Sequence, residues 1–199
     1  MSDIELIRNE VRAALGNAPV ARRWQWGARA LAATEVAVVV VCVGVALAIP
    51  RPLPPLRWLS AVLFVLVVAS GTVIAVKPPA AGSRGLFAGL ALLSVVVSAV
   101  SRGPLDLALH GPECVPLELL LALLPACLTL LILRSFAYRA EEAFIGGLAA
   151  GATGLLGLEL TCPVETTAHL VAYHFLPCIG VGLALTWTRS RLRSKTYAP

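Results

Sequence analysis

The stretch GGLAAGATGLLGLELTCPVETTAHLVAYH, residues 146–174, decides the fold of this chain. A glycine-rich apolar run ends at Cys162 and Pro163, and a second apolar run begins at His169 after a short polar break. Apolar runs of this length with so little charge predict helices that cross a membrane. The break between them then brings one thiol and the imidazoles of His169 and His174 to one edge of the membrane.

The composition of the whole chain agrees with a membrane protein. Of its 199 residues, 58% are hydrophobic and 14% are charged, and the mean hydropathy is +0.86. A bilayer core needs about 20 mostly apolar residues per helix. Six segments meet or approach this length: 28–49, 58–76, 85–100, 115–133, 144–160 and 169–187. We therefore predict an all-α polytopic transmembrane bundle of six helices. The third and fifth segments are short, and five helices with a re-entrant third segment is the alternative.

The distribution of lysine and arginine predicts the orientation in the membrane. Of the 16 cationic side chains, only Arg51, Arg57 and Arg102 fall on the side away from the termini. The positive-inside rule then places both termini in the cytoplasm. The predicted parts are a cytoplasmic segment at 1–27, a transmembrane domain at 28–187 and a basic cytoplasmic tail at 188–199. The net charge of +5 requires no nucleic-acid partner, because this topology and anionic lipid headgroups account for it.

Glycines recur through the fifth predicted helix. Gly147 and Gly151 have GxxxG spacing, and Gly154 follows on the same helix. Small residues let neighbouring backbones approach closely in lipid, where no hydrophobic force drives helices together. We expect these glycines to pack against other helices of the same chain, with homodimerisation through this face as the alternative.

Two of the five cysteines are predicted to lie at the membrane edge opposite the termini. Cys114 opens the fourth helix and Cys162 follows the fifth, and these helices form an antiparallel hairpin. Their outer ends are therefore neighbours. A disulfide requires Cα atoms within about 7 Å, which this placement allows, and a location outside the cytoplasm would permit oxidation. The other three cysteines fall near the midplane and are interpreted as packing residues: Cys42, Cys127 and Cys178.

Four ionisable residues gather near the same edge: Glu118, Glu159, His169 and His174. Such residues are costly in a bilayer and are candidates for function. Thiolate, imidazole and carboxylate groups are also the usual ligands of zinc and of softer cations. The spacing from Cys162 to the histidines matches no standard zinc motif, and on an α-helix His169 and His174 would lie about 140° apart. A metal ion here, tuning of the thiols and ordinary interfacial histidines all stay open.

The first residues predict an amphipathic helix. Its apolar positions recur at three- to four-residue spacing: Ile4, Ile7, Val11 and Leu15. Such a helix either lies on the membrane surface or docks in the groove of a partner. Charges of both signs on its other face leave both interpretations open.

Several of these features occur together in one known family. They are the cytoplasmic stretch LIRNEVRAALGNAPVARRW, the six helices, a cysteine near the start of the fourth helix, and GGLAAGATGLLGLELTCP followed by a helix with aromatic residues and histidines. In these respects the chain resembles the bacterial six-helix membrane-embedded anti-sigma factors of the NrsF-like group, which includes light-response regulators of the same build. The likeness spans nearly the whole chain.

The resemblance implies a regulator of the bacterial inner membrane and not an enzyme. It implies that segment 2–21 holds an extracytoplasmic-function sigma factor inactive, with Ile4, Ile7, Val11 and Leu15 in the contact. It further implies that Cys114 and Cys162 form an outer sensing pair, and that the sigma factor is released on an envelope, redox, metal or light-derived signal.

The competing function is a small membrane transporter or a thiol- or metal-handling membrane protein. A thiol oxidoreductase would use a CxxC pair, whose closeness tunes thiol reactivity, and the sequence contains none. A transporter would place ionisable groups near the midplane on several helices. Because the ionisable groups cluster at one edge, the sequence favours the regulator.

Overall fold

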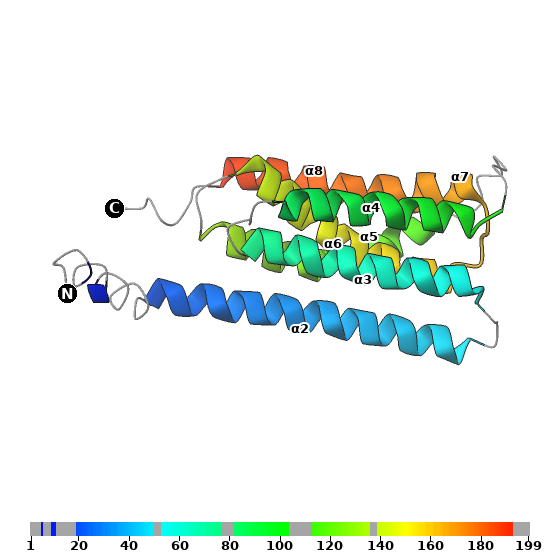
Figure 1. Ribbon diagram of the computed structural model, residues 1–199, viewed down its shortest axis with the longest axis horizontal. Coiled ribbons are helices and arrows are strands. Elements are labelled where there is room, and N and C mark those ends of the chain that lie inside the picture. The colour runs from blue at the N-terminus through cyan, green and yellow to red at the C-terminus, as the bar shows by residue number, and fades with distance from the viewer. Residues whose placement is uncertain are drawn as a thin grey trace.

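The computed structural model describes residues 19–49, 53–76, 82–103, 113–135 and 139–192, together with residues 5, 9 and 10. These residues are almost entirely helical (Figure 1), and six of the helices are long and apolar enough to cross a membrane. The predicted all-α bundle of six helices is therefore confirmed, and it fits a multi-pass membrane protein.

The helices differ from the predicted segments mainly at their ends. Their bounds are α2 (Pro19–Ala48), α3 (Pro55–Val76), α4 (Ser83–Val100), α5 (Cys114–Leu133), α6 (Ala140–Thr161), α7 (Thr167–Leu170), a π-helical turn η1 (Val171–Phe175) and α8 (Leu176–Arg191). The first helix starts well before residue 28, so most of its basic flank is already helical. The third segment forms the complete helix α4 of 18 residues, so the five-helix alternative is wrong. The fifth helix is not short, because α6 has 22 residues.

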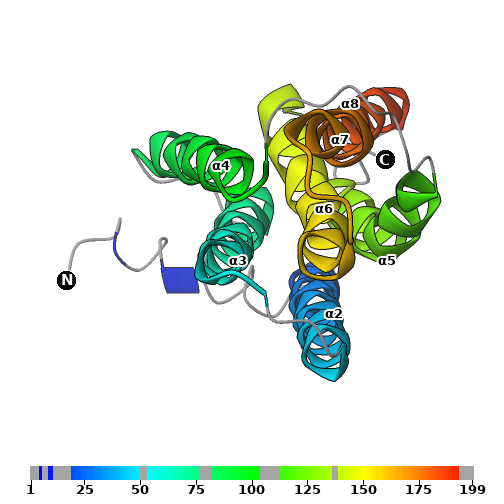
Figure 2. The ribbon, with the colours of Figure 1, turned by 90° about the vertical axis from the view of Figure 1, so that its right-hand side faces the viewer.

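Helix α6 occupies the centre of the bundle (Figure 2). It contacts α2, α3, α5 and α8, whereas α4 packs mainly on α3. Within the most apolar 18 residues of each helix, 83% of α6 is buried in the protein, against 17% of α4. A helix made largely of glycine, alanine and leucine suits this position, because its small residues admit neighbours on every side.

The glycines of α6 mark the closest approaches. A Cβ atom on Gly147 would lie 2.7 Å from the Cα of Gly182 on α8, and one on Gly151 would lie 2.9 Å from the carbonyl oxygen of Cys178. A Cβ on Gly154 would collide with the backbone oxygen of Glu118 on α5. The expected packing within one chain is confirmed. Because this face is already occupied, a homodimer would have to use a different surface.

The outer surface of the bundle is apolar, as lipid contact requires. Exposed apolar side chains occur on every peripheral helix, among them Val40, Leu47, Leu92, Leu120 and Leu183. The start of α2 and the end of α8 lie at the same end of the bundle (Figure 1), as an even number of spans requires. The assignment of that end to the cytoplasm stays a prediction from the cation count.

Candidate functional site

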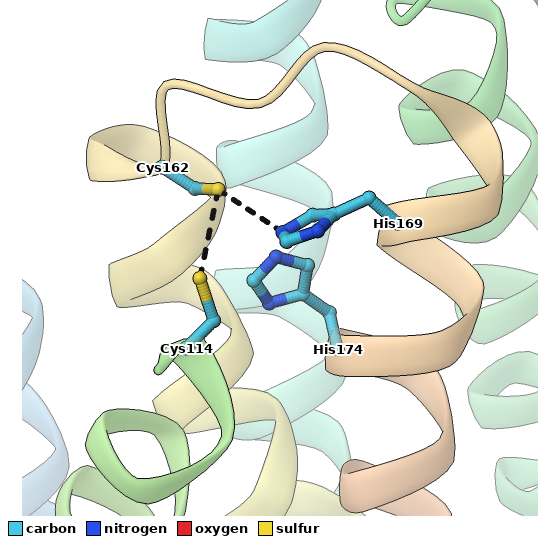
Figure 3. A group of neighbouring side chains, drawn as sticks. All are labelled: Cys114, Cys162, His169 and His174. Carbon is cyan, nitrogen blue, oxygen red and sulfur yellow. Dashed lines mark hydrogen bonds between the residues drawn. The ribbon is translucent and has the colours of Figure 1, made fainter. Parts of the chain in front are cut away.

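Two cysteines and two histidines meet at the end of the bundle opposite the start of α2 (Figure 3). Cys114 is the first residue of α5, Cys162 follows α6, His169 belongs to α7 and His174 to η1. One potential ligand atom from each residue lies within 4.8 Å of all the others. Cys162, His169 and His174 are buried, and Cys114 is partly exposed. The predicted meeting of the two cysteines is confirmed.

The contacts inside this cluster are close. The sulfur atoms of Cys114 and Cys162 are 3.9 Å apart, and the sulfur of Cys162 is 3.4 Å from Nε2 of His169. The rings of His169 and His174 meet edge to face with centroids 5.0 Å apart. The two sulfurs are not bonded to each other, because a disulfide bond is only about 2.05 Å long.

The expectation that His169 and His174 lie about 140° apart is wrong, and the cause is local. The backbone N–H of Leu176 bonds to the carbonyl of Val171, five residues earlier, which is the pattern of a π-helix. A π turn holds an additional residue, so side chains five positions apart come to the same face. Both histidines therefore point into the cluster.

Pro177 explains why the turn forms at this place. In an α-helix its ring would collide with the carbonyl of Tyr173, and it has no N–H to donate. Local π adjustments relieve such prolines in membrane helices. On the preceding side, the hydroxyl of Thr166 accepts a hydrogen bond of 3.3 Å from the backbone N–H of His169, which caps α7 and sets its start.

Glu118 on α5 contacts the cluster through His174. Its Oε2 lies 3.4 Å from Nδ1 of His174, and both side chains are almost completely buried. Neither ring nitrogen of His174 and neither carboxylate oxygen of Glu118 makes a hydrogen bond within the described part of the chain. A carboxylate next to one imidazole nitrogen orients the ring and leaves the other nitrogen to act as a ligand.

Glu159 is not part of the cluster, although the sequence placed it in the same group. Its Oε2 accepts a hydrogen bond of 2.7 Å from Arg102, and both side chains of this ion pair are fully buried. Arg102 also donates to the carbonyl of Val164 at 3.0 Å. The segment that joins α6 to α7 is thus tied to the end of α4.

Arg57 ties the same segment to α3. It donates to the carbonyl of Cys162 at 3.4 Å and to the carboxylate of Glu165 at 3.2 Å. The backbone N–H of Gly103 donates to the carbonyl of Glu165 at 2.7 Å, and Gly103 forms an isolated parallel bridge with Thr166. The start of α3 therefore holds the backbone at Cys162, and the end of α4 holds the residues that follow it.

Sequence reasoning missed the role of Arg57 and Arg102, which it counted only as cations on the side away from the termini. Arg57 is fully buried and Arg102 is 6% exposed. The signal that could have found them is the rarity of charges in membrane helices: two arginines at outer helix ends match the two outer glutamates, Glu159 and Glu165.

Other predicted residues fall outside this site. Ile4, Ile7, Val11 and Leu15 lie outside the described residues. At the opposite end of the bundle, Arg189 is buried and donates from Nε to the carbonyl of Leu133 at 3.1 Å. It therefore joins the last turn of α8 to the last turn of α5, and does not belong to a free basic tail.

Comparison with known proteins gives one informative relative. The chain is 27% identical over 187 residues to the carotenogenesis protein CarR of Myxococcus xanthus, covering 89% of this chain and 82% of the relative. No protein-family profile matches the chain, and no solved structure matches it. The similarity therefore extends over most of both chains.

Proposed function

We propose that this protein is a membrane-embedded anti-sigma factor. Its N-terminal segment holds an extracytoplasmic-function sigma factor at the inner membrane, and a change at the cluster of Cys114, Cys162, His169 and His174 releases it. The protein acts by binding and conformational change, without catalysing a reaction.

The observation that carries this proposal is the similarity to CarR along 89% of the chain. The name of that relative concerns carotenogenesis, and light-response regulators belong to the family that the sequence resembles. The six membrane-compatible helices and the outer cysteine pair agree with the same family. The similarity to CarR supports a regulatory role. That the partner is an extracytoplasmic-function sigma factor and that the signal acts at the cluster is what we propose.

The arrangement of the helices gives a route from the cluster to the opposite face. Cys114 lies at one end of α5, and the 20 residues of that helix span about 30 Å. His174 lies in the turn that leads into α8. At their far ends these two helices are joined by the hydrogen bond from Arg189 to Leu133. A shift between Cys114 and His174 is thereby transmitted to the end where α2 begins.

The proposal is tested by sigma-factor capture. We expect the full-length protein in membranes to retain an extracytoplasmic-function sigma factor of the same organism. Ile7→Asp and Val11→Asp should each release it, because placing a charge in an apolar groove costs several kcal/mol unless it is paired. A loss of about 1.4 kcal/mol already weakens binding tenfold. The matched control is Asn9→Asp, which adds the same charge on the polar face of the predicted helix.

The measurements are the sigma factor recovered with the membrane fraction and the expression of its target genes. Release by Ile7→Asp and Val11→Asp with full retention by Asn9→Asp supports the proposal. Full retention by all three variants argues against this segment as the contact. Failure of the unchanged protein to retain any such sigma factor argues against the anti-sigma function, and leaves the transporter alternative to be tested by transport assays in vesicles.

A further inference from the structure

We propose that Cys114, Cys162, His169 and His174 form a four-ligand site for a cation with a filled d shell, Zn²⁺ or Cu⁺. The binding step rests on the geometry of the cluster. Its regulatory meaning, that occupancy of the site controls release of the sigma factor, rests on the function proposed above.

The distances in the cluster are those of a tetrahedral site. Thiolate sulfurs lie about 2.3 Å and imidazole nitrogens about 2.05 Å from zinc. The edges of such a tetrahedron are about 3.8 Å between two sulfurs and about 3.6 Å between sulfur and nitrogen. The corresponding distances here are 3.9 Å between Cys114 and Cys162 and 3.4 Å between Cys162 and His169. All separations in the set are within 4.8 Å, so binding would draw the most distant donor atoms together by about 1 Å.

The donor set selects the kind of cation. Two sulfurs and two nitrogens in a tetrahedral arrangement favour zinc, and soft thiolates also select Cu⁺. Hard cations such as Mg²⁺ and Ca²⁺ prefer oxygen ligands, and carboxylate oxygens are not among the four central atoms. As the cation binds, the two thiols release their protons to water.

The electrostatics of the site fit a bound cation. Two thiolates neutralise Zn²⁺, so the complex carries no net charge at a place where an unpaired charge is costly. With Cu⁺ the same two thiolates leave one negative charge on the complex, so the charge balance of the site favours Zn²⁺. Cys114 is partly exposed and gives the cation an entry path.

His174 is the member of the cluster whose ring nitrogens have no hydrogen-bond partner among the described residues. It is 1% exposed. A buried polar atom without a partner costs about 1–3 kcal/mol. Glu118 stands at 3.4 Å from Nδ1, which leaves Nε2 for the cation. Figure 3 shows both imidazole rings directed into the space between the histidines and the sulfurs.

The scaffold around the cluster is built to hold it. The π turn brings His174 to the face of His169, Thr166 caps the helix in front of them, and Arg57 fixes the backbone at Cys162. The π turn, which Pro177 favours, has the consequence that a metal site needs, because it lets all four donor atoms converge on one point.

Metal binding is measured on the full-length protein purified in detergent and stripped with a chelator. Zn²⁺ and Cu⁺ are titrated separately in competition with a chromophoric chelator, and bound metal per chain is measured by mass spectrometry. We expect one ion per chain. Cys162→Ser and His174→Asn should each weaken binding by more than the roughly 10–100-fold that loss of an outer partner costs. Glu118→Gln should fall inside that range, and Cys127→Ser, an exposed cysteine of α5, should bind as the unchanged protein does.

Co²⁺ provides a check that does not depend on affinity alone. Bound to the unchanged protein and to Cys127→Ser, it should give the visible spectrum of tetrahedral thiolate coordination. Cys114→Ser is the third ligand variant, chosen because its partly exposed position makes a folding defect less expected. Circular dichroism monitors the fold of every variant. Binding of either cation supports the site, and the cation that binds more tightly of the two is its ligand.

Two results overturn the proposal. One is that the unchanged protein binds neither cation; the other is that Cys162→Ser, His174→Asn and Cys114→Ser bind as tightly as it does. Sigma-factor capture is measured separately, on metal-free and metal-loaded protein. Capture that is equal in both states removes the regulatory role and leaves the metal site, whereas metal binding without any capture contradicts only the anti-sigma function.

Discussion

The buried ion pair between Arg102 and Glu159 gives the sharpest test of how the end of the bundle beside the cysteines is held together. Both side chains are fully buried and their charged atoms are 2.7 Å apart. Glu159→Gln keeps the shape of the side chain and removes its charge, which leaves the guanidinium group buried without a counter-charge. Removing one partner of a buried pair destabilises a protein by about 3–5 kcal/mol. For a chain of this length, each kcal/mol lowers Tm by about 2–4 °C, so we expect a fall of about 6–20 °C.

Helix α6 supplies its own control. Glu141 forms a pair of 2.6 Å with Arg84 at the other end of the bundle, but these side chains are 65% and 48% exposed. Exposed pairs contribute about 0–1 kcal/mol, because water screens them. Glu141→Gln should therefore change Tm by less than about 4 °C. The assay is thermal unfolding of each purified variant in detergent, followed by circular dichroism and by the reactivity of the Cys162 thiol.

A double variant separates loss of charge balance from loss of packing. Replacing both partners, as Arg102→Met with Glu159→Met, removes the charges together, and apolar replacement of a buried pair is often neutral or stabilising. We expect this variant to be more stable than Glu159→Gln. The reasoning is refuted if Glu159→Gln is as stable as Glu141→Gln, or if the double variant is no more stable than the single one.

Four further outcomes are expected. Reporter domains fused after the C-terminus should be active in the cytoplasm and those inserted in 103–111 outside it; the reverse would contradict the assigned orientation. Gly147→Val should destabilise the protein by about 1–3 kcal/mol in thermal unfolding, whereas Gly180→Val, with nothing within 4 Å, should be tolerated. Pro177→Ala should weaken metal binding while the fold is kept, because an α-helical register becomes available; unchanged affinity would mean that the proline does not set the π turn. Arg189→Met should leave metal binding unchanged and reduce the effect of metal on sigma-factor capture, because it cuts the hydrogen bond between α8 and α5.

The sequence by itself determined the membrane class, the six spans and the edge at which the cysteines meet. These features depend on the length of apolar runs and on the order of loops along the chain, and both can be read without knowing any contact. An antiparallel pair of helices must bring the start of one next to the end of the other, so the approach of Cys114 and Cys162 followed from order alone. The glycines of α6 predicted close packing for the same reason, because a missing side chain is a local property.

Only the tertiary structure decided how the end that carries the cysteines and histidines is assembled. The meeting of His169 with His174 depends on one additional residue in the turn at Val171–Phe175, and a fixed α-helical period places them on different faces. The pairing of Arg102 with Glu159 joins positions 57 residues apart in the chain. The equal number of arginines and glutamates near this edge hints at pairing, but the sequence does not say which arginine meets which glutamate, because folding brings the partners together.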